Sequence, residues 1–330
     1  METGAAAPVF FGEVDSLFPL SEPRSGVRRV FCCSGISGQL RAGTGIFPGT
    51  IRRVVRIFGK LPAKSMGYFS QTVAVPPEWE DVFAPLYFAR NDDPVPVSHR
   101  LLPNLRTLLV FSLGTPASLS WQGEEIIVSG SIVLGPLRET LHYTLPAGSD
   151  IVVVNFRFDA FYRFFGPSLH SWVPRQLPEA LGHCFAGLRE DLRSLATPED
   201  RAACILAFSA TYLRQRENPA ERLIESGVYD RPLIKAAAAG AGQHLRTVQL
   251  NHKKYLGYTA KDMSRYQRFR EALRFLDEKV EKRVPVDWFE VVEAGGYYDQ
   301  SHLIRDFQYY LGVPPSRFLT LRDQLCVAVG

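Results

Sequence analysis

Cysteine and histidine are both scarce in this chain of 330 residues, which contains five cysteines and seven histidines. Cys32 and Cys33 are adjacent and the other three cysteines are scattered, so their spacing fits neither a disulfide framework nor a zinc site. Buried structural thiols are expected, and a reactive sensor pair at Cys32 and Cys33 is the alternative. No two histidines lie one residue apart on a strand beside a carboxylate, so the sequence predicts no metal site and no cofactor.

Long apolar runs are absent as well. No uninterrupted apolar segment is long enough to span a membrane, and residues 1–18 carry Glu2, Glu13 and Asp15 in place of the basic start of a secretory signal. We therefore expect a cytoplasmic protein with no membrane partner. The chain also lacks a glycine-rich phosphate loop and a Gly-x-Ser-x-Gly turn. Nucleotide hydrolysis and esterase chemistry thus have no support, and we expect that the protein is not an enzyme.

One stretch near the C-terminus has the pattern of a complete helix-turn-helix. A first helix is predicted over 288–294, Gly295 and Gly296 tolerate positive φ at its end, and Asp299 is placed to cap a second helix that begins near Gln300. On a helical wheel, the apolar residues of the second helix fall on one side and its polar residues on a separate arc. Amide, hydroxyl and guanidinium groups of this kind suit base edges and phosphates in a DNA major groove. The polar arc consists of Gln300, Ser301, Arg305 and Gln308.

The order of residues from Gly296 to Phe307, followed by Gly312 to Ser316, closely resembles the C-terminal signature of the AraC/XylS family of bacterial transcription regulators. The resemblance implies a regulator that binds double-stranded DNA through two helix-turn-helix units joined by a long helix. Further partners that it allows are RNA polymerase, a small-molecule effector and a second copy of the chain. We count His302 among the residues expected at the DNA.

A second copy of the unit lies 55 positions upstream, because that shift places residues 255–257 on residues 310–312. The first recognition helix is then expected at about 244–255 and the second at about 300–310.

The two copies differ in chemistry. In the first recognition helix, Leu250 stands where the family usually has arginine, and His252 stands where it usually has a core phenylalanine. The side chains of this helix that are expected to reach DNA are Arg246, Gln249 and Lys253.

Positive charge is concentrated between the two units. Residues 244–275 include eight Lys or Arg residues against two acidic ones, whereas the whole chain has a net charge of only +4. The apolar spacing of residues 264–276 predicts the connecting helix. A solvated basic helix is the alternative, but the flanking units favour a surface that neutralises the DNA backbone, with Arg265 and Arg268 adding charge near the DNA.

The N-terminal half has a different character. Short β-branched and aromatic runs within residues 27–158, bounded by Gly, Pro, Asn and Asp, predict a barrel or jelly-roll. Residues 135–166 resemble the end of the cupin-like sensor domain of some AraC-type regulators. An effector pocket would be sought first at Trp121, His142 and Tyr143, although plain core packing is the alternative for each. Strands are expected at 30–31, 51–58, 107–111, 118–121, 125–128, 131–134, 140–143 and 151–156.

Two helical segments follow, over 177–195 and 198–216, whose apolar stripes suit core packing, a bridging hairpin or a dimer surface. The predicted fold class is α+β multidomain: an N-terminal β-barrel or jelly-roll-like domain with a helical hairpin, then a C-terminal all-α domain with two helix-turn-helix units joined by a long helix. Domains are expected at 1–166, 167–220 and 221–330. The function implied is a sequence-specific DNA-binding transcription regulator. The alternative is a cupin-type small-molecule-binding or metal-dependent enzyme with an accessory helical module.

Overall fold

The computed structural model describes residues 67–121, 123–166, 175–176, 179–225, 244–321 and 325–326. All of them belong to one compact unit that spans residues 47–330. Within these ranges, no helix combines the length and the hydropathy needed to cross a membrane. The strands predicted at 30–31 and 51–58 lie outside the described residues.

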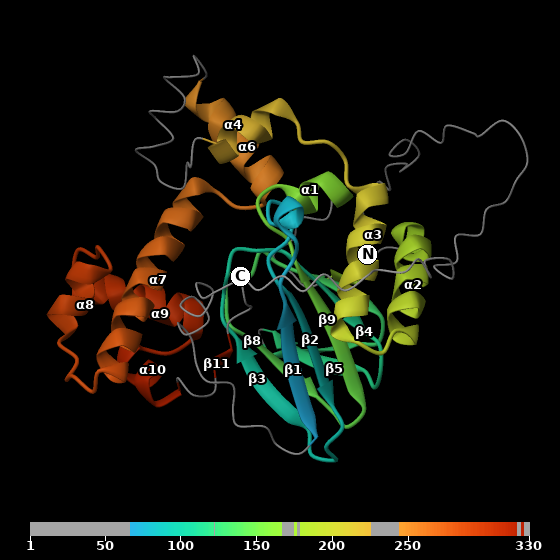
Figure 1. Ribbon diagram of the computed structural model, residues 1–330. Coiled ribbons are helices and arrows are strands. Elements are labelled where there is room, and N and C mark those ends of the chain that lie inside the picture. Colours follow the sequence, from blue (N-terminus) through green and yellow to red (C-terminus); the bar gives the residue numbers. More distant parts are fainter. Residues whose placement is uncertain are drawn as a thin grey trace, which may run out of the picture. The chain divides into compact units, whose positions relative to one another are not determined.

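Two β-sheets form the first part of the fold (Figure 1). The strand order is β1-β2-β9-β4-β7-β10 in the first sheet and β11-β3-β8-β5-β6 in the second. All pairings are antiparallel except that of β11 with β3. Because strands distant in sequence are neighbours in both sheets, the fold is jelly-roll-like, as predicted. The strands are β1 (Tyr68–Val73), β2 (Leu86–Asn91), β3 (Val97–Leu101), β4 (Leu108–Ser112), β5 (Ala117–Trp121), β6 (Glu124–Val128), β7 (Ser131–Leu134), β8 (Leu141–Leu145), β9 (Ser149–Asn155), β10 (Arg175–Gln176) and β11 (Leu325–Cys326).

The first sheet is buried on both faces. All five residues of β4 are buried, because alternate side chains of a strand point to opposite faces and each face has its own core. Leu108 and Val110 join the core between the two sheets, whereas Leu109 and Phe111 join a core on the other face. The space between the sheets is therefore packed with apolar side chains.

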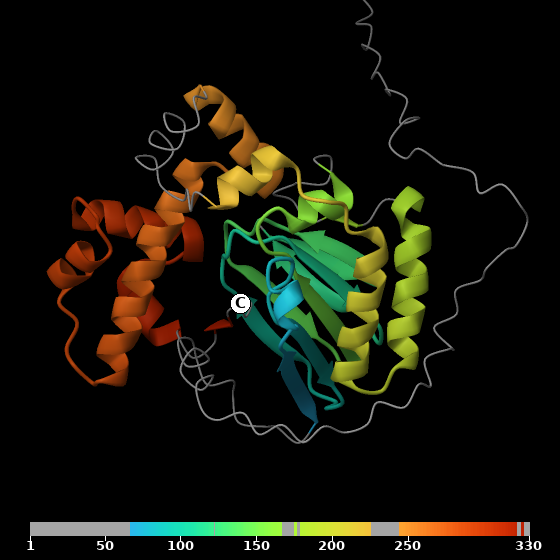
Figure 2. The same ribbon diagram turned by 45° about the horizontal axis from the view of Figure 1, so that its top comes forward.

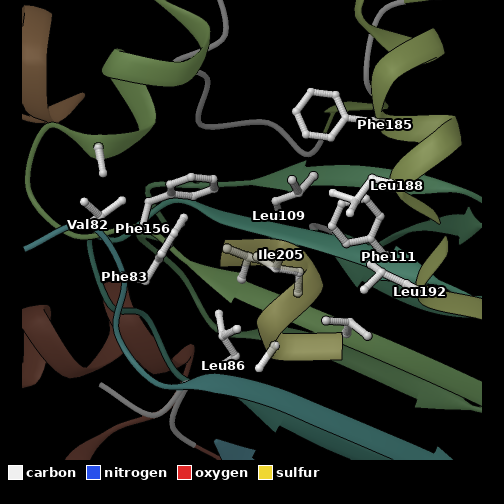
Figure 3. Packing of buried hydrophobic residues seen from close by; sticks show 14 of the residues in the cluster. Val82, Phe83, Leu86, Leu109, Phe111, Phe156, Phe185, Leu188, Leu192 and Ile205 are labelled. Carbon is white, nitrogen blue, oxygen red and sulfur yellow. The ribbon is translucent and has the colours of Figure 1, made fainter. Parts of the chain in front are cut away.

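Three helices cover the outer face of the first sheet: α1 (Ala160–Phe165), α2 (Glu179–Ser194) and α3 (Pro198–Tyr212). Helices α2 and α3 lie side by side against this sheet (Figures 1 and 2). Phe185 and Leu188 of α2 and Ile205 of α3 pack toward Leu109 and Phe111 (Figure 3). The apolar stripes predicted for this segment therefore take part in core packing.

The remaining helices form the C-terminal part of the fold. The long helix α7 begins with a capping box, in which the Thr259 hydroxyl accepts a hydrogen bond from the Asp262 amide and the Asp262 carboxylate accepts one from the Thr259 amide. One side of α7 packs against α8 and α9, and α10 packs against α9. Phe269, Leu273 and Phe307 belong to the core that these helices share. The α7 to α10 region can be followed in Figure 2. The helices are α4 (Asn218–Glu225), α6 (Leu245–Leu256), α7 (Ala260–Glu281), α8 (Trp288–Ala294), α9 (Gln300–Leu311) and α10 (Pro315–Leu321).

Candidate nucleic-acid interface

The helix α9 separates its apolar and polar residues onto opposite sides, as the sequence predicts. Its first turn is fixed by Asp299, whose carboxylate accepts a hydrogen bond from the His302 amide at 2.7 Å. Its last turn ends at Gly312 in the left-handed conformation, with φ 70°. The buried side is Leu303, Asp306, Phe307, Tyr310 and Leu311, and the exposed side includes Gln300, Ser301, Ile304, Arg305 and Gln308.

Aromatic packing and one ion pair hold α9 on α7. The ring of Phe307 meets that of Phe269 edge-on, with centroids 5.2 Å apart. Arg265 of α7 donates from Nε to the Asp306 carboxylate at 2.6 Å, and its guanidinium lies 3.9 Å from the centroid of the Tyr309 ring. Asp306 is only 1% exposed, so this pair lies beneath the polar arc. The exposed side of α9 is therefore presented by a fixed helix.

The turn between α8 and α9 contains one expected and one unexpected glycine. Gly296 has φ 65°, which favours glycine, as predicted. The prediction for Gly295 was wrong, because its φ is −79°. A Cβ atom at that position would instead lie 2.7 Å from the Tyr297 ring, so Gly295 is needed for the close approach of that ring.

The two tyrosines after these glycines have opposite surroundings. Burial of Tyr297 raises the pKa of its hydroxyl, whereas the side chain of Tyr298 is 93% exposed.

Helix α6 repeats the geometry of α9 at a position 55 residues earlier. Helix α6 begins and ends 55 residues before α9, and α7 begins 55 residues before α10. Helices α6 and α9 both end at a left-handed glycine, Gly257 with φ 78° and Gly312 with φ 70°. The equivalent buried pairs are Val248 and Leu303, His252 and Phe307, Tyr255 and Tyr310, and Leu256 and Leu311. The first helix of the upstream unit would fall within 226–243, outside the described residues.

His252 of α6 stands where α9 has Phe307, and its buried imidazole forms a hydrogen bond. His252 is fully buried, and its Nδ1 lies 2.7 Å from the carbonyl oxygen of Tyr258, just beyond the end of the helix. Its ring also meets the Tyr258 ring edge-on at 5.3 Å. The imidazole of His252 therefore links α6 to the turn after it, through the carbonyl oxygen and the ring of Tyr258.

The outward arc of α6 carries the residues proposed from sequence. Arg246 and Lys253 are exposed, and Gln249 is half-buried. Leu250 shares this arc and is 52% exposed. In α9, the corresponding arc includes Arg305 and Ser301 in place of Leu250 and Arg246. The two arcs thus differ at equivalent positions, with Leu250 on α6 where α9 has Arg305, and Arg246 on α6 where α9 has Ser301.

The basic stretch is less free than its composition indicates. Arg265 is paired with Asp306, and Arg274 is paired with Glu271 and Glu278. The expectation that Arg265 adds free positive charge is therefore corrected, because a carboxylate 41 positions away neutralises it.

Lys254 is also engaged by other groups. It donates to the hydroxyl of Tyr255 and to Glu217, and the hydrogen bond to Tyr255 is the main cause of its raised pKa. Arg268 is half-buried, with its guanidinium 5.9 Å from the centroid of the Tyr297 ring. Within the part of the chain that the structure describes, the exposed cations that form no ion pair with a carboxylate include Arg246, Lys253, Lys261, Arg270 and Arg305.

The residues suggested for an effector pocket do not all face the same way. Trp121 and Tyr143 pack against the core between the sheets, whereas His142 alternates to the opposite face of β8, where it pairs in register with Arg100. Partial burial and the charge of Arg100 lower the pKa of His142.

His99 is the histidine that joins Tyr143. Their ring centroids are 5.5 Å apart, and the ring centroid of Tyr68 lies 5.6 Å from that of His99. Sequence inspection missed this cluster, because only the β3–β8 register brings His99 opposite Tyr143.

A small recess lies outside the sheet interior, between the first sheet and its covering helices. Leu109, Phe156, Phe185 and Ile205 are among the side chains that line it (Figure 3). Its one hydroxyl, from Ser209, donates to the Ile205 carbonyl oxygen at 2.6 Å. The described residues contain no group of three His, Cys, Asp or Glu side chains that could hold a metal ion.

Comparison with known proteins gave only distant structural similarities. No family model matches the chain, and no curated protein matches it. ToxT from Vibrio cholerae is 11% identical, with 78% of this chain and 99% of that chain covered and a TM-score of 0.36. ToxT from strain SCE256, described as bound to an unsaturated fatty acid, is 10% identical, with 78% and 96% covered and a TM-score of 0.33. KdgF from Halomonas sp. is 16% identical, with 29% and 87% covered and a TM-score of 0.21. TM-scores this low do not establish a shared fold.

Proposed function

We propose that this protein is a transcription regulator of the AraC type that binds double-stranded DNA by placing α6 and α9 in the major groove. The observation that carries the proposal is the repeat itself. Helices α6 and α9 lie 55 residues apart and bury side chains at equivalent positions. Each ends at a glycine in the left-handed conformation, and each exposes to solvent the side opposite its buried residues. A helix with a fixed core side and a free polar side is the form that enters a major groove.

The charge distribution supports DNA as the partner. Exposed cations occur on α6, on α7 and on α9, at Arg246, Lys253, Lys261, Arg270 and Arg305. Cations spread over three helices of one region neutralise several phosphates at once, and release of the displaced counterions makes such binding strongly dependent on salt. Gln300 and Arg305 supply the groups that bond adenine and guanine in pairs.

The β-sheet region is the sensing or pairing part in this proposal. An effector would be sought near Trp121 and Tyr143, half-buried at the border of the core between the sheets. A second copy of the chain and RNA polymerase are the protein partners that a regulator of this kind would have. It would act in the bacterial cytoplasm, where its DNA lies.

Selection of bound sequences from genomic fragments tests the function directly. The full chain is expected to enrich a common sequence, and its binding should weaken steeply as salt is raised. Arg305→Ala should then weaken binding to the selected site by about 5- to 150-fold, the range for loss of one two-bond base contact. Its effect on random duplex should be small, because random duplex offers no matched guanine.

Arg90→Ala is the matched control, since Arg90 is an exposed arginine of β2, far in sequence from α6 and α9, that pairs with Asp92 two positions on. That variant should bind the selected site like the parent protein. Equal losses on selected and random DNA for Arg305→Ala would show that α9 does not read bases. Failure to enrich any sequence would remove the proposed function altogether.

A further inference from the structure

An exposed leucine lies at the centre of the outward arc of α6. At about 100° per residue, Leu250 points opposite the buried stripe formed by Val248, His252 and Tyr255. Its side chain is 52% exposed, and the neighbours on its arc are the exposed Arg246 and Lys253. Leu250 therefore lies outside the buried stripe that packs α6 onto the rest of the domain.

The repeat shows what is unusual about this leucine. Arg305 occupies the equivalent place on α9, and the residue before it there is Ile304, which is 39% exposed. On α6 the same two places hold Gln249 and Leu250. Each recognition helix thus has one aliphatic and one polar side chain at these two places, but in the opposite order.

Major-groove chemistry gives an exposed leucine in this position a partner. Among the groups that base pairs present there, the C5 methyl of thymine is the apolar one. Arg246 lies one turn before Leu250 on α6 and Lys253 lies one turn after it, and both cations suit phosphates. If they bind the DNA backbone, Leu250 between them faces the base edges rather than a protein surface. Charge around the leucine therefore favours DNA as the partner that covers it.

We infer that Leu250 is a specificity-determining residue that contacts a thymine methyl group in the half of the site bound by α6. This inference rests on the proposed function and extends it. The two half-sites are then unlike: one is read by a methyl contact from Leu250, and the other by hydrogen bonds from Arg305. A single chain carrying both helices therefore binds an asymmetric site in one orientation.

Deoxyuridine substitution isolates the methyl group, because deoxyuridine pairs like thymine and lacks only that group. Each thymine of the selected site is replaced in turn, on both strands, and binding to the full chain is measured by competition. One position is expected to lose roughly fourfold in affinity, the equivalent of one buried aliphatic carbon. Leu250→Ala should lose a similar factor on the thymine site and should no longer distinguish thymine from deoxyuridine at that position.

A double-mutant cycle measures the coupling energy between Leu250 and the methyl group, by combining Leu250→Ala with the replacement of thymine by deoxyuridine. Ile304→Ala is the matched control, because it removes an exposed aliphatic side chain from the other helix. It should leave the response at the Leu250 position intact. Circular dichroism should show unchanged helix content for both variants, since neither side chain is part of the core.

Two results would overturn the inference while leaving the proposed function in place. One is sequence-specific binding with no sensitivity to deoxyuridine at any position. The other is a deoxyuridine penalty that persists unchanged in Leu250→Ala. Loss of a dimer in sedimentation of Leu250→Ala, without a change in deoxyuridine response, would assign the leucine to a protein contact and refute the methyl contact. Absence of any sequence-specific binding is a different result, because it refutes the proposed function itself.

Discussion

Replacing Arg265 by methionine should destabilise the C-terminal helices more than replacing Asp306 by asparagine, although both changes break the same ion pair. The reason is the unequal burial of the partners. Asp306 is 1% exposed, and Arg265 is 31% exposed. Without Arg265, a carboxylate remains in the interior beside Phe307 with its cation gone. Without the Asp306 charge, the guanidinium still reaches water and still lies over the Tyr309 ring.

The magnitudes follow from that difference. Removing the partner of a buried charge costs about 3–5 kcal/mol, and the lower end applies to Arg265→Met because the site is at the edge of the core. Asp306→Asn should cost only about 1–2 kcal/mol, since the amide oxygen can still accept a hydrogen bond and the arginine stays partly hydrated. The double variant Arg265→Met with Asp306→Leu should lie within about 1 kcal/mol of the parent protein, because no charge is then buried.

Hydrogen exchange of the peptides that carry α7 and α9 is the suitable assay, because it measures opening of this region separately from the sheets. Lys261→Met is the control, since it removes an exposed cation of the same helix that forms no ion pair with any carboxylate of the described residues. It should change protection little. A destabilisation by Asp306→Asn that equals or exceeds that of Arg265→Met would refute the reasoning from burial. A double variant as unstable as Arg265→Met alone would refute it as well.

Two further predictions concern a buried histidine and a helix cap. Burial lowers the pKa of His99, so the folded protein binds fewer protons there than the unfolded chain. His99 therefore leaves the free energy of unfolding unchanged above about pH 6.5 and reduces it as the pH falls below that value. His99→Phe should therefore reduce the loss of stability between pH 7.5 and 5.5, by at most about 1.4 kcal/mol per pH unit, in urea unfolding followed by circular dichroism, and an unchanged pH dependence would contradict this. Asp262→Ala should lower protection from hydrogen exchange in the first turn of α7 by about 1 kcal/mol, because it removes the capping box with Thr259, whereas Asp262→Asn should retain part of it. Equal protection in the alanine variant and the parent protein would show that the cap is not needed.

The local parts of the fold could be predicted from the sequence, and the long-range parts could not. Helix α8 has the predicted bounds, and α9 begins at the predicted residue, because caps such as Asp299 and Gly312 are encoded within a few positions. Strands β4 to β9 lie within two residues of their predictions, because alternation and turn residues are also local signals.

Strands β1, β2 and β3 were all missed. The sequence of β3, from Val97 to Leu101, includes serine, histidine and arginine and has only a weak apolar pattern. Its register with β8 follows from the whole sheet, and so the cluster of His99 with Tyr143 could not be foreseen.

The candidate site shows the same division. The exposed arc of α9 could be listed from helical periodicity alone, since the buried positions repeat regularly. The neutralisation of Arg265 could not, because Asp306 lies 41 positions away and becomes its partner only when α7 and α9 pack. Counting charges along a sequence therefore overstates the charge that reaches the surface.

The buried histidine of α6 has a consequence for engineering the two related helices. His252 bonds the Tyr258 carbonyl oxygen, whereas the equivalent Phe307 lies among the rings of Phe269 and Phe318. Helices α6 and α9 are therefore not interchangeable as whole segments, because a phenylalanine at position 252 would leave that carbonyl oxygen without its imidazole partner. A residue should be moved from one helix to the other only at an outward position such as that of Leu250, because each helix then keeps its own buried residues and the contacts that they make.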